Sequence, residues 1–375
     1  MNGIFPIRGT VKNYDWGGAG YIPHLFGLEN SEGKPFAEYW MGIHPSGVSM
    51  IWKKNHWVPI SEKAAALPFL LKVLDVKNML SIQVHPDLQG AKEGYEKENA
   101  LGIPLDSPHR NYRDPNHKPE MMVALSDFWL LHGFKPSEEM VDLLTRVQVL
   151  NEFLPVFTEK GYEGLYHQIM RLSSEEVDRC LVPLRDSLVS EPPVNKNKED
   201  YWAAKAFGTN EGSIKIDKGI FSIYLFNLIH LKKGEGIFQG AGLPHAYLEG
   251  QNVEIMANSD NVLRGGLTSK NIDVTELLRH VKCKATYPQI LLSEESLVEQ
   301  QYESEVTDFS LRSLHLKKGD NMNWIAEKDE IMLITEGEIQ TGNLLLKAGS
   351  PAAFIQKGEG LLVEALENAV VFIAS

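Results

Sequence analysis

Cysteine is scarce in this sequence of 375 residues, which contains only Cys180 and Cys283. Two thiols cannot form a disulfide framework or a zinc site made of thiolates, and such low usage is typical of a reducing compartment. The sequence also lacks the run of ~18 apolar residues that a membrane helix needs, and its first residues show no signal-peptide pattern. We therefore expect a cytoplasmic protein with no membrane partner.

Positive charge is in deficit, with 37 Lys and Arg against 50 Asp and Glu and a formal net charge of −13. An acidic surface repels nucleic acids and anionic lipids, so we expect neither as a partner. If the substrate is an anion, its site must supply local Lys or Arg against this background. A chain of 375 residues exceeds what one hydrophobic core usually serves, so two or three structural units are expected.

The pattern of apolar residues and turn residues divides the chain into four parts. Short apolar runs between turn residues predict strands in residues 1–136 and again in residues 211–290. Ser137 is a suitable N-cap, and the apolar residues after it follow at helical spacing, which predicts a helical insert over 137–210. Closely spaced short strands predict a β-sandwich or jelly roll over residues 291–375.

Three local features of the third part can be stated more closely. The apolar run 219–226 predicts a strand. Segment 234–245 is dense in glycine, which permits tight turns and close approach of the backbone. Residues 273–280 predict a short helix, with Thr275 and Glu276 near its start.

A stripe of polar residues alternates with apolar ones near residue 80. On a strand, Ser81, Gln83 and His85 would point to one face, while Ile82 and Val84 would point to the other. Gln and His two residues apart on a strand can share a metal ion, and His is a frequent metal ligand. The alternative is a strand with a solvated outer face.

A second group of polar residues stands between two prolines that restrict the backbone. It contains His117 and Lys118 and is followed by Glu120, which leads into an apolar run that we expect to be buried. A buried carboxylate needs a partner, because an unpaired buried charge is costly. The partner could be a metal ion, Lys118 or Arg264.

A third group begins with His245, which follows the glycine-rich turn and enters a predicted strand. Such a His can be a ligand at the mouth of a barrel, or it can be a capped histidine of the core. Downstream, Glu254, Asp260 and Arg264 stand among glycines and asparagines. These three could line a site, or they could form a solvated loop with an Asp–Arg pair.

Taken together, six segments resemble, in order, the motifs of the type I mannose-6-phosphate isomerase family, which belongs to the cupin superfamily. They are KNYDWG at 12–17, YWMGIHPSG at 39–47, LSIQVHPD at 80–87, NYRDPNHKPEM at 111–121, GLPHAYLEG at 242–250 and NSDNVLRGGLT at 258–268. The resemblance implies a mainly β fold with an α insert. It implies a cupin jelly-roll β-barrel as catalytic domain, a helical insertion and a second, C-terminal cupin-like β-domain.

The resemblance also implies an activity, namely the interconversion of mannose 6-phosphate and fructose 6-phosphate through an enediol(ate). One Zn²⁺ per chain would be the cofactor, although other divalent metals suit the ligands. The family's metal ligands fall on Gln83, His85, Glu120 and His245, where Gln83 replaces a His of many cupins. Its catalytic residues fall on Arg264, Lys118, His117, Asp260 and Glu254, and its substrate-binding residues on Ser81, Lys118 and Arg264.

Other readings compete with this one. An isomerase of another phosphosugar would look similar, whereas a non-catalytic cupin that binds sugar or regulates should have lost ligands or Arg264. A cupin dioxygenase would favour a set of His ligands, and a bifunctional isomerase would need a nucleotidyltransferase motif that the sequence lacks. The residue that moves the proton stays open among His117, Lys118, Glu254 and Asp260. We expect a monomer whose partner is a small phosphosugar.

Overall fold

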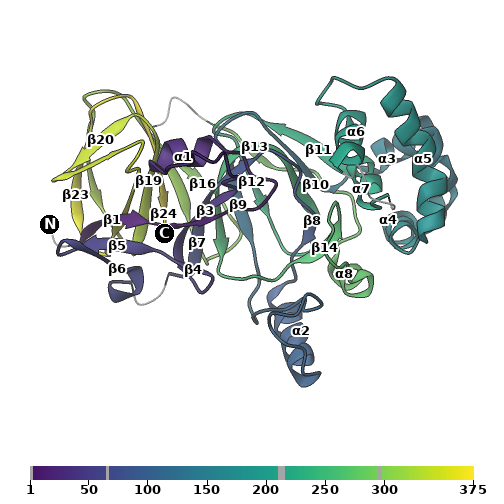
Figure 1. Ribbon diagram of the computed structural model, residues 1–375, viewed down its shortest axis with the longest axis horizontal. Helices are drawn as coiled ribbons and strands as arrows, with labels where there is room; N and C mark the ends of the chain where they lie inside the picture. Colours follow the sequence, from purple (N-terminus) through teal and green to yellow (C-terminus); the bar gives the residue numbers. More distant parts are fainter. Residues whose placement is uncertain (1–2, 65–66, 210–215, 294–297) are drawn as a thin grey trace.

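The computed structural model describes residues 3–64, 67–209, 216–293 and 298–375, and in these ranges it is mainly β with eight α-helices. Its strands form sheets of twelve, eight and four strands. The helices α3–α6 gather at one end of the molecule and the C-terminal strands at the other (Figure 1). A mainly β fold with a helical segment is therefore confirmed. No helix of the described part is long and apolar enough to cross a membrane.

The twelve-stranded sheet occupies the middle of the molecule (Figure 1). Its longest strand, β13, pairs antiparallel with β7, β8, β9 and β10 and so joins most of the sheet. The strands are β2 (Thr10–Lys12), β3 (Glu38–His44), β4 (Gly47–Val48), β7 (Phe69–Val76), β8 (Ile82–Val84), β9 (Glu120–Ala124), β10 (Phe128–Phe134), β11 (Phe226–Leu231), β12 (Gly236–Gln239), β13 (His245–Ala257), β14 (Leu263–Gly266) and β15 (Ile290–Leu291).

The register of this sheet places distant polar residues opposite one another. Gln83 of β8 stands opposite His245 of β13 on one side and opposite Arg264 of β14 on the other. Farther along β13, Glu254 stands opposite Lys72 of β7. Because successive side chains of a strand alternate between its faces, these registers fix which polar groups can meet inside the sheet.

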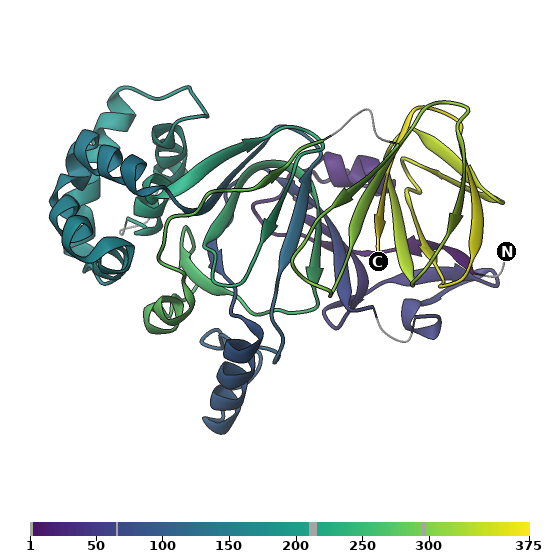
Figure 2. The same ribbon diagram turned by 180° about the vertical axis from the view of Figure 1, so that it is seen from behind.

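The eight-stranded sheet draws on both ends of the chain (Figure 2). Residues 4–6 of its first strand pair with residues 353–355, and its neighbouring hairpin also comes from the first sixty residues. Its strands, in spatial order, are β16 (Glu299–Tyr302), β17 (Leu311–Leu316), β24 (Ala369–Ala374), β19 (Glu330–Glu336), β22 (Ala352–Ile355), β1 (Ile4–Arg8), β5 (Met50–Lys53) and β6 (His56–Pro59).

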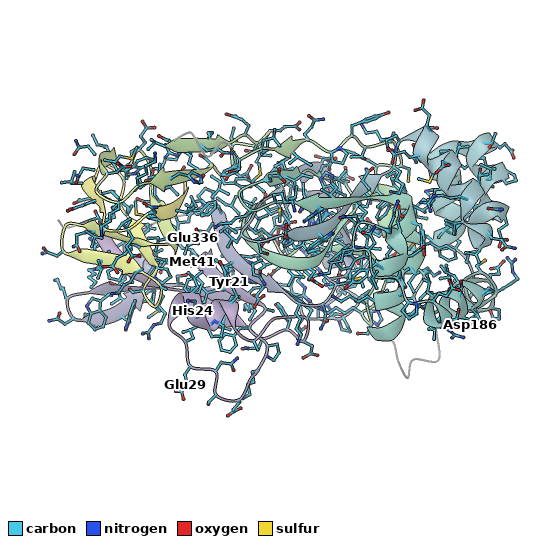
Figure 3. All side chains as sticks on the ribbon, turned by 90° about the horizontal axis from the view of Figure 1, so that it is seen from above. Tyr21, His24, Glu29, Met41, Asp186 and Glu336 are labelled. Carbon is cyan, nitrogen blue, oxygen red and sulfur yellow. The ribbon has the colours of Figure 1, made fainter. Side chains whose placement is uncertain are left out.

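A four-stranded sheet packs on these C-terminal strands through a shared apolar core. It consists of β18 (Asn321–Ile325), β23 (Gly360–Ala365), β20 (Glu338–Thr341) and β21 (Leu344–Lys347). Helix α1 (Tyr21–Phe26) lies against this region, since the Gly349 N–H donates to the Leu25 carbonyl at 2.8 Å. Figure 3 shows Tyr21 of α1 near Glu336 of β19, with Asp186 of the helical region far away.

The segment expected to be helical contains no strand in its described part, residues 137–209. Helix α3 starts at Ser137, so Pro136 and not Ser137 is its N-cap. Ser173 caps helix α5 through a capping box with Glu176. The helices are α3 (Ser137–Arg146), α4 (Leu154–Met170), α5 (Ser174–Ser190) and α6 (Glu199–Thr209), with a 3-10 helix at Gln148–Phe153.

Two further helices stand beside the central sheet. Helix α2 (Leu88–Ala100) projects from the body (Figure 1), and the Asp87 side chain accepts the Gly90 N–H at its start. Helix α8 (Val274–His280) confirms the short helix expected there, with Asp273 as its N-cap.

The strand expected over residues 219–226 is wrong, because most of this run forms helix α7 (Gly219–Leu225) and strand β11 begins only at Phe226. Every residue of α7 is buried, so the helix shows no polar face. A short run that is apolar on all sides carries no periodicity that separates a helix from a strand. The run starts where Gly219 packs on the backbone of Gly266.

That contact makes a specific prediction about Gly266. Its φ is +127°, and a Cβ built on it would lie 2.3 Å from the Gly219 Cα. Gly266→Ala should lower the free energy of unfolding by at least about 2 kcal/mol, because an unfavourable φ and overpacking each cost ~1–3 kcal/mol. Urea unfolding of the variant measures the loss.

Gly360→Ala is the matched control, since a Cβ there meets nothing within 4 Å and its φ is not in the left-handed region. It should change stability by less than about 0.5 kcal/mol. Equal behaviour of the two variants would contradict close packing of α7 on β14.

Candidate metal centre

Three buried side chains from three segments converge on one point. His85 follows β8, Glu120 begins β9 and His245 begins β13, and a potential ligand atom from each lies within 4.8 Å of the others. The two Nε2 atoms lie 3.4 Å (His85) and 3.2 Å (His245) from the two oxygens of Glu120. Gln83, the fourth ligand expected, stands opposite His245 in the strand register and lines the adjoining cavity.

The hydrogen bonds of both imidazoles leave their Nε2 lone pairs free. His85 Nδ1 donates to the Asn261 carbonyl at 2.8 Å, and His245 Nδ1 donates to the Leu243 carbonyl at 3.0 Å. This orientation is the one that prepares a His as a metal ligand. His85 Nε2 is buried and has no hydrogen-bond partner among the described residues. Burial lowers the pKa of His85 to about 4, so at neutral pH this ring carries no proton to share with Glu120.

Glu120 is ionised in spite of its burial. Burial alone would raise its pKa, but Lys118 Nζ lies 2.8 Å from Oε1, and Lys118 and the imidazoles hold this pKa well below the usual range. An orphaned imidazole nitrogen, a second imidazole and a carboxylate thus face one space. Two His and one Glu form a common ligand set for catalytic zinc, so the residues fit a divalent metal.

A cavity of about 1080 Å³ opens beside this cluster. Besides Gln83, Glu120 and His245, it is lined by all of the expected catalytic and substrate-binding residues except His117. These lining residues are Ser81, Lys118, Glu254, Asp260 and Arg264. The chain that follows α2 also contributes to the wall, through Asp106, Pro108, Arg110 and Asn111.

The structure places His117 elsewhere. Its Nε2 lies 3.0 Å from Asp308 Oδ1, and its side chain is not part of the cavity lining. The two prolines around this segment do fix its backbone, but they turn Lys118 and not His117 toward Glu120. Sequence spacing between adjacent residues could not decide which of them faces the site.

A buried network that sequence reasoning missed lies deeper in the cavity. Lys72 Nζ lies 2.9 Å from Glu254 Oε1 and 3.7 Å from Glu38 Oε2. The Tyr247 hydroxyl donates to Glu254 Oε2 at 2.8 Å. Burial would lower the pKa of Lys72, but Glu254 and then Glu38 raise it above its ordinary value, so the ammonium stays charged. A lone lysine in the apolar run of β7 was the available signal.

The cavity is also lined by a group of three cations. Arg113, Arg264 and Lys270 all line it, and no ion pair joins any of them to a carboxylate within the described ranges. Burial and then Arg113 lower the pKa of Arg264, and burial followed by Arg264 and Arg113 lowers that of Lys270. The Asp260–Arg264 ion pair considered from sequence is therefore not formed. Three mutually repelling cations favour an anionic ligand.

The cluster predicts a sharp difference between two histidines. His85→Ala should weaken divalent-metal binding at least roughly 100-fold, because loss of even a supporting group around a metal typically costs 10–100-fold. His117→Ala should bind metal normally, since His117 is not part of the cluster and its Nε2 faces Asp308. Metal titration of chelator-stripped protein, followed by elemental analysis, measures both, and equal affinities would refute the cluster as the metal site.

Comparison with known proteins finds mannose-6-phosphate isomerases that align with nearly the whole chain. The family profile described as phosphomannose isomerase type I, catalytic domain, matches residues 4–137. The mannose-6-phosphate isomerase of Escherichia coli (strain K12) is 34% identical over 384 aligned residues, which cover 96% of this chain and 95% of that protein. The human mannose-6-phosphate isomerase is 29% identical over 412 aligned residues, covering 97% and 94%.

Solved structures agree in fold as well as in sequence. A Salmonella typhimurium mannose 6-phosphate isomerase, described as bound to substrate (F6P) and zinc, superposes with a TM-score of 0.86 at 31% identity and covers 99% of both chains. A mannose 6-phosphate isomerase described as holo and zinc-bound gives a TM-score of 0.86 at 30% identity, again covering 99% of both chains. The chain therefore belongs to the type I mannose-6-phosphate isomerase family.

Proposed function

We propose that this chain interconverts mannose 6-phosphate and fructose 6-phosphate through an enediol(ate). The observation that carries the proposal is a buried His–Glu–His cluster beside a cavity whose lining includes three cations that form no ion pair within the described ranges. The first suits a metal that binds sugar oxygens, and the second suits a phosphate. The bacterial relative described with F6P and zinc supports this assignment.

The metal site would consist of Gln83, His85, Glu120 and His245 and would hold one Zn²⁺ per chain. When bound, the ion supplies positive charge that polarises the sugar oxygens around C1 and C2 and favours loss of the C2 proton. The protein's part is to keep Glu120 ionised, which Lys118 does, and to orient both imidazoles, which the two backbone carbonyls do.

The isomerisation moves one proton between C2 and C1, and the geometry favours Asp260 as the base that carries it. Lys118 is already engaged by Glu120, and Glu254 is engaged by Lys72 and Tyr247. Asp260 lines the cavity, its side chain is 35% exposed, and its carboxylate has only one ion-pair contact among the described residues. Its carboxylate would take the C2 proton and return it to C1, while the O2 proton passes to O1.

The substrate would be held at its charged end by the cationic wall. Arg113, Arg264 and Lys270 surround space that suits the phosphate, with Ser81 lining the same cavity. Arg264 lines the same cavity and stands opposite Gln83, a proposed metal ligand, in the strand register. A guanidinium can hold two oxygens at fixed separation, which suits both the phosphate and the enediolate.

We further propose that the large sheets belong to cupin-like jelly-roll barrels. The catalytic unit would comprise residues 1–136 and 211–290, interrupted by the insert 137–210. The second unit would comprise residues 291–375, completed by β1, β5 and β6. Antiparallel pairing across both sheets supports this division.

The same reasoning extends to partners and compartment. The net charge of −13 argues against a nucleic acid as partner, whereas the local cations of the cavity suit a small phosphosugar. Two cysteines, neither of them in a disulfide, support a place in the cytoplasm. We propose a monomer, because the proposed site is lined by residues of one chain.

A coupled assay tests the function. Wild-type protein should form fructose 6-phosphate from mannose 6-phosphate, lose this activity to a chelator and regain it with zinc. Activity that survives complete metal removal would refute the metal-dependent reaction, and no product at any metal loading would refute the assignment.

Arg264→Lys should lower kcat by roughly 10²–10³-fold, the typical cost of losing one preorganised donor at a developing oxyanion. Lysine keeps the charge, so the loss reports geometry. Metal content and the melting temperature should stay normal, because Arg264 makes no ion pair within the described ranges.

Arg279→Lys is the matched control, as Arg279 is exposed and its ion pairs with Glu93 and Glu276 lie outside the cavity lining. It should keep its activity. A near-normal kcat for Arg264→Lys, or a loss that follows unfolding, would remove Arg264 from the catalytic residues.

A further inference from the structure

We propose that His44 is a positioning residue, which orients the Asp260 carboxylate for proton transfer as a neutral N–H donor without touching the substrate. The inference rests on the proposed function. His44 ends β3, its side chain is 4% exposed, and it is not part of the cavity lining, whereas Asp260 is. His44 can therefore act on the reaction only through a residue that reaches the cavity.

The tautomer of His44 is set by its neighbour. The Ser46 backbone N–H donates to His44 Nδ1 at 3.2 Å, so Nδ1 carries a lone pair and the ring proton is on Nε2. Nε2 lies 3.5 Å from Asp260 Oδ1. This is longer than an ordinary hydrogen bond, but catalytic hydrogen bonds commonly tighten in the complex with substrate. The N–H is thus aimed at the carboxylate.

The ring of His44 is held and kept neutral. Trp40 meets it edge-on, with centroids 5.0 Å apart and planes at 84°, and Trp40 is itself fixed by its Nε1–H donating to Glu38 Oε2. Burial lowers the pKa of His44, although the facing carboxylates Asp260 and Asp114 raise it, and Lys72 and Lys12 lower it further. A neutral donor orients a carboxylate without giving it a proton.

The backbone of Asp260 is fixed independently of His44. Its N–H donates to Asp114 Oδ2 at 2.8 Å, and the next residue, Asn261, donates through its side chain to the Asp114 and Asn116 carbonyls. The Asn261 carbonyl in turn accepts the Nδ1–H of His85. The remaining freedom of Asp260 lies in its side chain. Among the described residues, His44 makes the only ion-pair or hydrogen-bond contact with that carboxylate.

Removing the donor should have two effects on the reaction. The carboxylate would turn more freely, and misplacement of a reacting group by about 1 Å can cost on the order of 10²-fold in rate. Its ionised form would also lose a facing N–H donor, which favours that form over the protonated one. The acid limb of the profile of kcat/KM against pH should then move to higher pH. A merely structural role would not move that limb.

Two variants separate positioning from structure. In His44→Asn, the side-chain oxygen can still accept the Ser46 N–H, but no group remains where Nε2 faced Asp260. In His44→Gln, the longer amide can donate toward Asp260. We expect His44→Asn to lose roughly 10–100-fold in kcat with little change in KM, and His44→Gln to recover most of it. His24→Asn, on the exposed face of α1, is the control and should behave as wild type.

The test adds Asp260→Asn, alone and combined with His44→Asn. If His44 acts through Asp260, the double variant should be no slower than Asp260→Asn alone. The inference is overturned if His44→Asn keeps the wild-type kcat and pH profile, if both His44 variants lose activity together with melting temperature, or if the losses add. It is also overturned if Asp260→Asn is fully active. Wild-type protein without isomerase activity would refute the proposed function, and this inference with it.

Discussion

The ionised carboxylate of Glu120 is the constraint around which the site is built. A buried charge is costly unless positive groups offset it, and Glu120 lies at the start of a strand whose residues are all buried. Lys118 provides one full charge at 2.8 Å, and His85 and His245 turn their Nε2 atoms toward the same carboxylate at 3.4 and 3.2 Å. Two imidazoles and a carboxylate that face one space form a ligand set that suits a divalent cation. The fold itself therefore argues for a metal.

Strand β13 connects the metal-ligand cluster with a second group of buried charges. It begins with His245 at the cluster and continues to Glu254, which is held by Lys72 and Tyr247 in a second buried group of charges. Cavity walls so rich in partnered charge resist rearrangement, because moving one group leaves others unpaired. Asp260 and the three cations have no ion pair closer than 3.5 Å among the described residues, so they are available to a substrate.

Sequence predicted the parts of the site that depend on local pattern. Alternation along one strand predicted Gln83 and His85 on one face, which stays a prediction, and the carboxylate of Glu120 could be recognised because it enters an apolar run. Adjacent residues with equal chemistry were harder, and His117 faces Asp308 while Lys118 faces Glu120. Lys72 was not predicted as part of the site, because the role of a lysine in a buried strand can be inferred only when its distant partners are known. Helix α7 was misjudged because burial on all sides removes the periodicity that distinguishes helix from strand.

The pairing of strands that lie far apart along the chain could not be predicted from the sequence. Ile4 stands opposite Ile355, and nothing in either segment specifies the other, because both are short apolar strands that would suit many neighbours. The same non-local assembly explains how a chain of net charge −13 builds a positive wall. Arg113 precedes β9, Arg264 is on β14 and Lys270 follows it, so the fold concentrates three cations from a sequence in which acids predominate. The charge at the site thus depends on the topology of the fold. The acidic composition of the chain does not prevent this concentration of cations and only makes it differ from its surroundings.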